Sequence, residues 1–223
     1  MGNPGSERMY VPRHFDESRP EALRELVRDH PFATLVTWNG EGLDANHLPM
    51  ELDAEPAPYG TLVGHVARAN PVWQRTAAAV DALAIFHGPQ GYVSPGWYPT
   101  KAETGKVVPT WNYAVVHATG RLRFIEDRAW LRALVERLTR RYEAGRPTPW
   151  AVSDAPPEFL DAMLGAIVGV ELVVTGLAGK WKLGQNRPRA DRDGMMRGLA
   201  AEPSASAVEL AAMMRRTFER DPE

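Results

Sequence analysis

The chain has 223 residues, of which 44% are hydrophobic and 24% charged, and its formal net charge is −2. This length is enough for one domain with a substantial core, and the charge balance offers no basic excess for binding nucleic acid. Because the chain has no cysteine, disulfides, thiolate nucleophiles, iron–sulfur clusters and cysteine-ligated zinc are excluded, and redox chemistry would need a bound cofactor.

The sequence contains neither a run of about 18 apolar residues nor a signal-peptide pattern. We therefore expect a cytoplasmic protein without a membrane span. Residues 1–8 are expected to form a flexible lead-in, residues 9–200 the main domain, and residues 201–223 a C-terminal helix and tail.

The first part of the chain predicts a helix and a hairpin. Apolar residues at helical spacing predict a helix over 19–29, which Pro31 ends. Two alternating segments, FATLVTW (32–38) and LDANHLPM (43–50), flank an Asn-Gly turn and predict two paired strands.

The middle of the chain predicts three further strands, a short helix and a long loop. The strands are TLVGHVA (61–67), ALAIFHG (82–88) and GYVS (91–94). Asn70 and Pro71 can cap and begin a short helix, and the loop covers residues 94–110.

The segment KVVPTWNYAVVHATG (106–120) alternates like a strand and continues into GRLRFIE (120–126). One face is bulky and partly polar: Trp111, Tyr113, Val115, His117 and Thr119. The other face is mostly small: Asn112, Ala114, Val116 and Ala118. This pattern fits an ordinary half-buried strand or one wall of a pocket for a flat ligand.

The remaining part predicts a helix over 129–143 that Asp127 starts, with a buried side formed by Trp130, Leu131, Leu134, Leu138 and Tyr142. A helix over 158–167, a long strand over 168–179 and a last helix within 204–220 follow. Many short strands with few helices favour an antiparallel barrel.

Four histidines, His47, His65, His87 and His117, fall inside predicted strands. Because none has a close partner at metal-ligand spacing, we expect structural or ligand hydrogen-bonding roles for them and no metal site, while a haem or metal site stays an alternative.

Two segments have features that suit phosphate or a ring. GHVARANPVW (64–73) places Arg68 beside a predicted helix start, which fits a phosphate site or a plain strand-to-helix turn. KWKLGQNRPR (180–189) is basic and fits a ligand site, a solvated rim or a weak nucleic-acid patch. Flat-ring stacking could come from Trp73, Tyr92, Trp97, Tyr98, Trp111 and Tyr113. Together these features fit a flavin mononucleotide (FMN) site.

Six motifs occur in a fixed order: MYVPRHF, HLPM, GHVARANPVW, IFHGPQGYVSPGWY, VPTWNYAVVHATG and KLGQNR. In this order the chain resembles the PaiB family of FMN-binding split-barrel proteins over about residues 9–215. The resemblance implies a mainly β fold with peripheral α-helices, a six-stranded antiparallel split β-barrel, and a homodimer with FMN between the subunits.

The resemblance also implies cofactor-binding residues. The phosphate region would be His65, Val66, Ala67, Arg68 and Asn70. The isoalloxazine wall would be His47, Leu48 and Pro49 with Thr110, Trp111 and Asn112. Lys182, Gln185 and Arg187 would reach the flavin from the partner chain. The loop 99–108 is longer than the family pattern and could gate the cleft.

The implied role is a negative transcriptional regulator or a redox-sensing protein. One alternative is an FMN-dependent oxidoreductase that acts on a small molecule with NAD(P)H, although no acid–base dyad is recognisable. Another is a haem-binding protein on the same barrel. The sequence has no helix-turn-helix signature and is slightly acidic, which argues against direct DNA binding.

Overall fold

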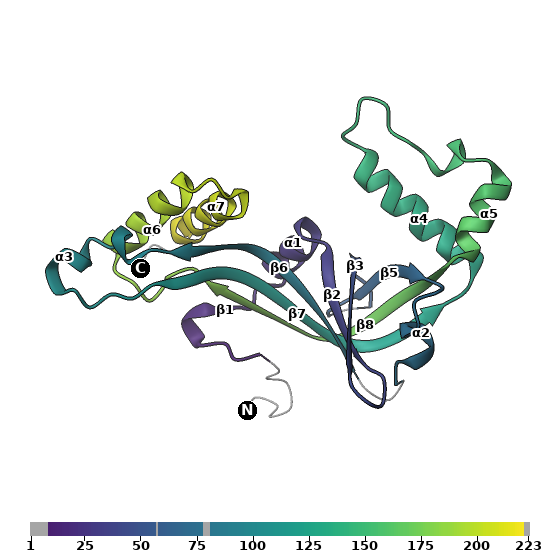
Figure 1. The fold of residues 1–223 in the computed structure, drawn as a ribbon, viewed down its shortest axis with the longest axis horizontal. Helices are drawn as coiled ribbons and strands as arrows, with labels where there is room; N and C mark the ends of the chain where they lie inside the picture. The colour runs from purple at the N-terminus through teal and green to yellow at the C-terminus, as the bar shows by residue number, and fades with distance from the viewer. Residues whose placement is uncertain (1–8, 57, 78–80, 221–223) are drawn as a thin grey trace. The chain divides into compact units, whose positions relative to one another are not determined.

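A computed structural model describes residues 9–56, 58–77 and 81–220, so the expected lead-in at 1–8 lies outside the described residues. The chain divides into two compact units (Figure 1). Unit 1 comprises Met1–Leu26, His87–Val116 and Ala178–Glu223, and unit 2 comprises Val27–Phe86 and His117–Leu177. The domain boundary expected at residue 200 stays a prediction.

The strands of unit 2 form the barrel. Its complete strands are β2 (Phe32–Trp38), β3 (Leu43–Pro49), β4 (Glu51–Asp53) and β5 (Thr61–Ala67). Three long strands contribute part of their length: β6 (Ala82–Val93), β7 (Thr110–Ile125) and β8 (Ile167–Lys182). The strand order is β3-β2-β6-β7-β8-β5-β4, and short β1 (Asp16–Glu17) pairs with β8. The β2–β3, β2–β6, β4–β5 and β5–β8 ladders are all antiparallel.

The expected count of six strands is wrong, because the strand order runs through seven strands. The strand predicted over 43–50 is β3, and the additional strand is β4, which the sequence did not predict. Between them lies buried Met50, whose N–H donates to the Pro31 carbonyl at 2.8 Å. Before this bend β3 pairs with β2, and after it β4 pairs with β5. The single residue Met50 therefore joins the two ends of the strand order.

Helices α4 (Arg128–Glu143) and α5 (Pro157–Gly165) belong to unit 2, together with the short helices η3 (Val152–Asp154) and α2 (Val72–Arg75). The Asp127 side chain accepts the Trp130 N–H at 2.7 Å, which confirms the expected start of α4. Tyr142 is 47% exposed, so its expected burial is wrong.

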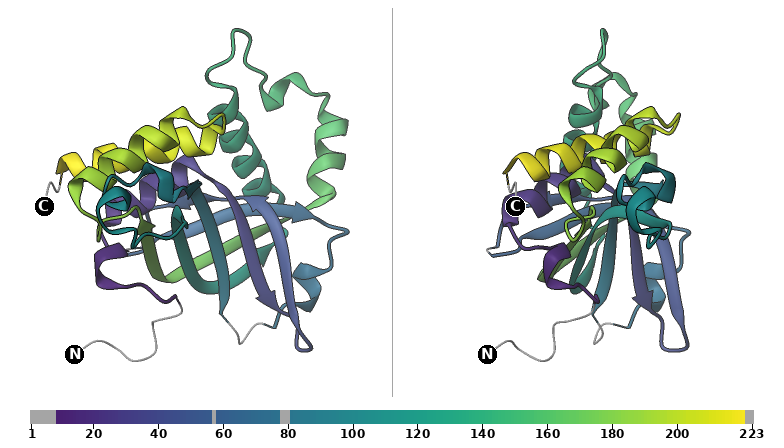
Figure 2. Two further views of the ribbon diagram at one scale, coloured as in Figure 1. Left: turned by 60° about the vertical axis from the view of Figure 1, so that its left-hand side comes forward. Right: turned by 90° about the vertical axis from the view of Figure 1, so that its left-hand side faces the viewer.

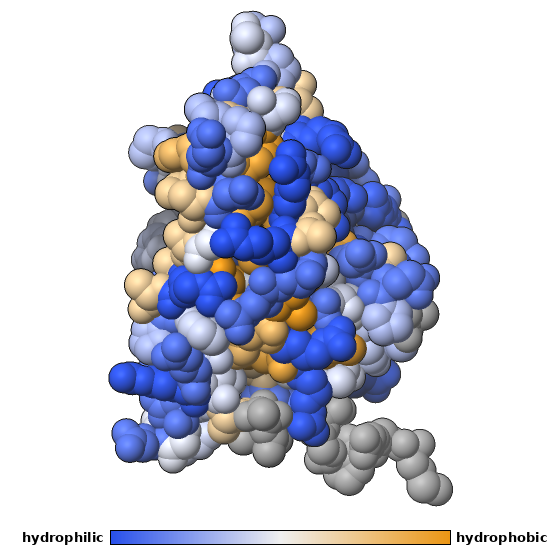
Figure 3. Space-filling view, turned by 90° about the vertical axis from the view of Figure 1, so that its right-hand side faces the viewer, coloured by the Kyte–Doolittle hydropathy of each residue, from blue (hydrophilic) through white to orange (hydrophobic). Residues whose placement is uncertain are grey.

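The buried side of α4 contacts two neighbours. Leu134 and Leu138 pack on Val63 of β5. Leu131 packs with Val152, Leu160 and Leu164 of the following segment. Figure 2 shows α4 and α5 from two further directions, and Figure 3 shows a face on which hydrophobic side chains lie between hydrophilic ones.

Unit 1 contains most of helix α1 (Pro20–Asp29), which confirms the first predicted helix, and the pair α6 (Arg189–Ala201) and α7 (Ala205–Arg220). It also contains η1 (Arg13–Phe15), η2 (Pro95–Trp97) and α3 (Thr100–Thr104), so the segment expected to be a loop over 94–110 is partly helical. The sequence did not predict α6.

The two strands predicted at 82–88 and 91–94 are one strand, β6. Gly91, the first residue of the second predicted strand, is closely packed: an added Cβ would lie 2.8 Å from the Leu199 Cδ2 atom of α6. In the part of the chain that the structure describes, no helix is both long enough and apolar enough to span a membrane.

Candidate functional site

The expected cofactor-binding residues fall into two groups, one in each unit. The first group, in unit 2, comprises His47, Leu48, Pro49, His65, Val66, Ala67, Arg68 and Asn70. The second group, in unit 1, comprises Thr110, Trp111, Asn112, Lys182, Gln185 and Arg187. Each group is assembled by its own set of contacts.

The first group is assembled where β3 meets β5. A Cβ on Gly64 would lie 2.8 Å from the Pro49 carbonyl oxygen and 3.3 Å from Leu48 Cδ1, so only glycine allows this approach. The Asn70 side-chain amide donates to Asn46 Oδ1 at 2.6 Å. The structure therefore brings the HLP segment of β3 beside the GHVARAN segment, although the two are separate in sequence.

Arg68 makes several contacts within its own unit. Its Nε donates to the Gly165 carbonyl at 2.8 Å, Nη2 to the Ile167 carbonyl at 3.2 Å, and Nη1 to the Glu126 carboxylate at 2.6 Å. Its guanidinium also lies 5.5 Å from the centre of the Trp73 ring. Gly165 ends α5, where helical carbonyls lack partners. These contacts give Arg68 a structural role, and its expected contact with phosphate stays a prediction.

The helix start that was expected to bind phosphate is short. Helix α2 has only 4 residues, and Pro71 precedes it instead of occupying its first position. The Asn70 Oδ1 atom accepts the Val72 N–H at 3.0 Å, so Asn70 orients this turn. A single turn supplies little of the macrodipole that favours anions.

The four histidines lie in strands, as expected, at His47 in β3, His65 in β5, His87 in β6 and His117 in β7. His47 Nδ1 lies 3.2 Å from Thr34 Oγ1. Burial lowers the pKa of His65, and its buried Nδ1 has no hydrogen-bond partner among the described residues. Residues 9–56, 58–77 and 81–220 contain no cluster of three or more His, Cys, Asp or Glu that could hold a metal ion.

The second group is assembled where β8 ends beside the start of β7. The Lys182 Nζ donates to Thr110 Oγ1 at 2.5 Å and to the Trp111 carbonyl at 2.7 Å. The pKa of Lys182 is lowered by burial and by two neighbouring cations, Lys180 and Arg187. We call Lys180, Lys182 and Arg187 the cation cluster.

Two members of the second group make internal contacts. Asn112 is 1% exposed, and its amide nitrogen lies 3.7 Å from Met195 Sδ. The Gln185 side chain closes its own turn, because Oε1 accepts the Leu183 N–H at 2.9 Å and Nε2 donates to the Trp181 carbonyl at 2.6 Å. Both side chains shape the backbone around the cation cluster.

The alternation expected along β7 is confirmed. The small face is buried at Asn112, Ala114, Val116 and Ala118. On the other face Trp111 is 54% exposed, and its ring centre lies 6.3 Å from that of Tyr92, which is 48% exposed. An accessible aromatic pair therefore lies in the same unit as the cation cluster.

Sequence reasoning missed the residues of α6 that hold the segment before β7. The Asp191 carboxylate, 1% exposed, accepts the Thr100 hydroxyl at 2.8 Å and its N–H at 3.2 Å. Trp97 lies against Gly194 and Gly198, where an added Cβ would lie 2.0 Å from the Trp97 carbonyl oxygen and 2.1 Å from its ring. In the sequence, the available signal for this contact was the pair of glycines four residues apart, together with a separate loop that carries a tryptophan.

Two cavities of unit 2 lie elsewhere, along α4. One of about 430 Å³ is lined by residues that include Glu51, Asp53 and Arg140, and one of about 250 Å³ by residues that include Asp53 and Glu171. Neither is lined by a member of the first group. Both lie among ion pairs that join α4 and the strands, such as Arg137–Glu51 at 2.7 Å.

Comparison with known proteins gives consistent matches. Residues 9–176 match the family described as "Putative FMN-binding domain". The chain is 32% identical over 209 residues to the protease synthase and sporulation protein PAI 2 of Bacillus subtilis, which covers 92% of this chain and 96% of that protein. It is 33% identical over 225 residues to an uncharacterized protein of Emericella nidulans, with 85% and 90% covered.

Two solved structures share the fold. The flavocytochrome Anf3 from Azotobacter vinelandii aligns with a TM-score of 0.58 at 14% identity, covering 84% of this chain and 80% of that one. The FAD and heme binding protein from Mycobacterium smegmatis aligns with a TM-score of 0.56 at 18% identity, covering 80% and 78%. The likeness is one of fold, and it supports the mainly antiparallel split barrel expected from the sequence.

Proposed function

This chain belongs to the PaiB-type family of FMN-binding domains, with FMN as its cofactor, and we propose that it is a cytoplasmic flavoprotein that acts as a negative regulator of transcription or as a redox sensor. The observation that carries the proposal is the approach of β5 to the HLP segment at Gly64, because it assembles backbone groups from two strands in one place. The similarity to the protease synthase and sporulation protein PAI 2 of Bacillus subtilis supports the regulatory role.

The residues present fit the parts of FMN. The exposed Trp111 and Tyr92 rings suit a flat isoalloxazine. The cation cluster suits a phosphate group. When bound, FMN would supply one- or two-electron redox chemistry, while the chain positions the ring and sets its electrostatic surroundings.

We further propose a homodimer in which the second group of one chain completes the flavin site of the other. Subunit mixing tests this directly. A Gly64→Val chain alters the first group, and an Arg187→Gln chain alters the second. If the site is shared, mixing the two weak binders restores flavin binding at part of the sites. Mixed dimers with no restored binding would contradict a shared site.

The regulatory role predicts that the flavin state changes an association with DNA or with a protein partner. The exposed arginines of α7, Arg215, Arg216 and Arg220, offer phosphate contacts. A gel-shift titration with oxidised and reduced protein at several salt concentrations measures direct DNA binding. Binding that is absent in both states would restrict the role to an indirect one.

The second candidate is an FMN-dependent oxidoreductase that uses NAD(P)H. Anaerobic mixing of the FMN-loaded protein with NADH or NADPH distinguishes it, because a reductase would bleach the flavin absorbance. A bleaching rate no higher than that of free FMN would reject this candidate.

A third candidate is haem binding, and His65 favours it. Its Nδ1 has no hydrogen-bond partner among the described residues. The two solved structures described above are those of a flavocytochrome and of an FAD and heme binding protein. Added haem would then give a Soret band that shifts in a His65→Ala variant. An identical Soret band in the variant would exclude His65 as a ligand.

A further inference from the structure

The larger cavity of unit 2 is lined by β4 and α4 and has a volume of about 430 Å³. This volume is in the range of sites that bind small molecules. The lining consists of residues 51–54, which are β4 and the residue after it, and of three arginines of α4: Arg137, Arg140 and Arg141. Among the described residues, no member of the first or second group lines this cavity, so it is separate from the expected cofactor residues.

Glu51 fixes two of these arginines in place. Its side chain is buried, and the carboxylate accepts Arg137 Nε at 2.7 Å and Arg141 Nη1 at 3.4 Å. Arg141 also donates through Nη2 to the Arg28 carbonyl. Because this buried carboxylate is already matched by two guanidinium groups, it positions the arginines and is not available to a ligand.

Two other charged residues of the lining have no such partner. Arg140 is exposed on α4, and Asp53 is exposed at the end of β4. Neither side chain forms a hydrogen bond or an ion pair with another residue in the part of the chain that the structure describes. Arg140 therefore keeps its guanidinium N–H groups, and Asp53 keeps both carboxylate oxygens. The cavity thus presents one unpaired cation and one unpaired anion.

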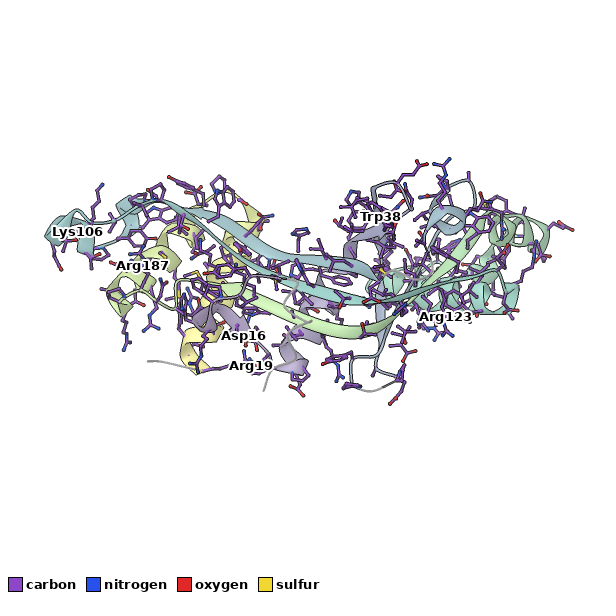
Figure 4. The ribbon with its side chains drawn as sticks, turned by 90° about the horizontal axis from the view of Figure 1, so that it is seen from below. Asp16, Arg19, Trp38, Lys106, Arg123 and Arg187 are labelled. Carbon is purple, nitrogen blue, oxygen red and sulfur yellow. The ribbon has the colours of Figure 1, made fainter. Side chains whose placement is uncertain are left out.

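The neighbouring cavity of about 250 Å³ does not supply a cation for Asp53 either. Asp53 and Arg137 line both cavities, and Arg137 donates to Glu51. The other arginine of the smaller cavity is Arg123 of β7, labelled in Figure 4, and it pairs with Glu171. Both arginines are matched by other carboxylates, so Asp53 stays open to a positively charged group of a ligand.

A ligand that matches this lining carries one negative and one positive group. Arg140 suits a carboxylate, because a guanidinium offers parallel N–H donors to the two oxygens. Asp53 suits an ammonium group, which has donors only. Leu52 and Ala54 form the uncharged part of the lining, against which an aliphatic side chain can pack. A free α-amino acid with an aliphatic side chain combines these three parts.

We propose that the cavity lined by β4 and α4 binds a free α-amino acid with an aliphatic side chain. The carboxylate of the ligand pairs with Arg140, and its ammonium group pairs with Asp53. This inference goes beyond the proposed function and does not depend on flavin binding.

Three probes that share one aliphatic group separate the two contacts. They are L-leucine, 4-methylpentanoate, which lacks the ammonium group, and 3-methylbutylamine, which lacks the carboxylate. NMR titration of the purified full chain, a method that suits weak binding, measures the three dissociation constants. The wild type should bind L-leucine at least about tenfold more tightly than either analogue, because each analogue loses one hydrogen-bonded ion pair.

Two variants assign the contacts to their residues. Arg140→Gln should weaken L-leucine about tenfold to a hundredfold and abolish its advantage over 3-methylbutylamine. Asp53→Asn should weaken L-leucine by a similar factor and abolish its advantage over 4-methylpentanoate. Arg132→Gln is the matched control, because Arg132 is an exposed arginine of α4 that pairs with Glu136 and does not line the cavity. It should keep all three affinities.

Both test positions are exposed and unpaired, so the variants should keep the urea midpoint of the wild type. A wild type that does not bind L-leucine, or that binds L-leucine and both analogues equally, would overturn the proposal. An equal loss of L-leucine affinity in Arg132→Gln and Arg140→Gln would also overturn it, because the effect would then be one of overall charge. FMN is titrated separately, and a protein that binds L-leucine but not FMN would refute the proposed function and support this site.

Discussion

Substituting Gly198 by alanine tests the packing of α6, because two physical effects have opposite signs there. Gly198 lies within α6, where alanine is favoured over glycine by about 1 kcal/mol of helix propensity. The structure predicts that this gain is outweighed. A Cβ at this position would lie 2.1, 2.4 and 2.6 Å from three ring atoms of Trp97.

The size of the effect follows from these distances. Carbon atoms in contact are normally about 3.5–4.0 Å apart, so the indole ring would have to move by roughly 1 Å or more. Overpacking of this kind costs about 1–3 kcal/mol. After the propensity gain is subtracted, Gly198→Ala should lower the free energy of unfolding by about 1 kcal/mol.

A double-mutant cycle with Trp97→Ala separates the clash with the ring from the effect of helix propensity. Without the ring the clash disappears, so in that background Gly198→Ala should raise the free energy of unfolding by about 1 kcal/mol. Urea unfolding of the four proteins, followed by circular dichroism, measures each change from the midpoint at constant slope. Stabilisation by Gly198→Ala in the wild-type background, or the same effect in both backgrounds, would refute the reasoning.

Three further predictions concern unit 2. Gly64→Ala should lower the free energy of unfolding by about 1–3 kcal/mol in urea and weaken FMN binding, because its Cβ would lie 2.8 Å from a backbone carbonyl oxygen. As a control, an added Cβ on Gly42 would meet nothing within 4 Å, so Gly42→Ala should change the free energy of unfolding by less than about 0.5 kcal/mol. Equal effects of Gly64→Ala and Gly42→Ala would contradict the account. Glu51→Gln should cost about 1–3 kcal/mol, because its buried carboxylate accepts from two partly exposed arginines of α4. Glu136 pairs with Arg132 in an exposed ion pair, so Glu136→Gln should lower the free energy of unfolding by less than about 0.5 kcal/mol. A larger loss for Glu136→Gln than for Glu51→Gln would contradict the account. Burial lowers the folded-state pKa of His65 below its ordinary 6.5, so its contribution to stability is full above pH 6.5 and is lost as pH falls toward the folded-state pKa. His65→Gln should reduce the fall in urea midpoint below pH 6.5, and an unchanged profile would show that another group causes it.

Local signals in the sequence predicted the hairpin of β2 and β3 and the start of α4. The Asn39 side chain accepts the Gly42 N–H at 2.8 Å, and Gly40 has a φ of +97°, so the hairpin follows from its turn residues. Asp127 caps α4 in the same local way. These elements can be predicted from neighbouring residues alone.

Elements that depend on tertiary packing could not be read in this way. Position 50, where the chain bends, is methionine, and Pro49 before it was the only local signal for the end of β3. Nothing local indicated that the chain continues as β4 with a new partner strand. Gly194 and Gly198 of α6 make room for Trp97, which is distant in the sequence. Gly91 of β6 makes room for Leu199 in the same way.

The candidate site shows the same limit. The sequence indicated a cation near a helix start at Arg68, but the carbonyl of Gly165, 97 residues away, accepts from it. It likewise gave no sign that Lys182 would reach Thr110, 72 residues earlier. Residue types were predictable, whereas their partners depend on contacts that only the fold establishes.

The most direct measurement of the central claim is a titration of the purified protein with FMN, followed by the absorbance and fluorescence of the flavin. The account predicts saturable binding with one FMN per chain and a shifted flavin spectrum, and the same cofactor should be identified by mass after release. A protein that is isolated without flavin and leaves the FMN spectrum unchanged at saturating concentrations would contradict it.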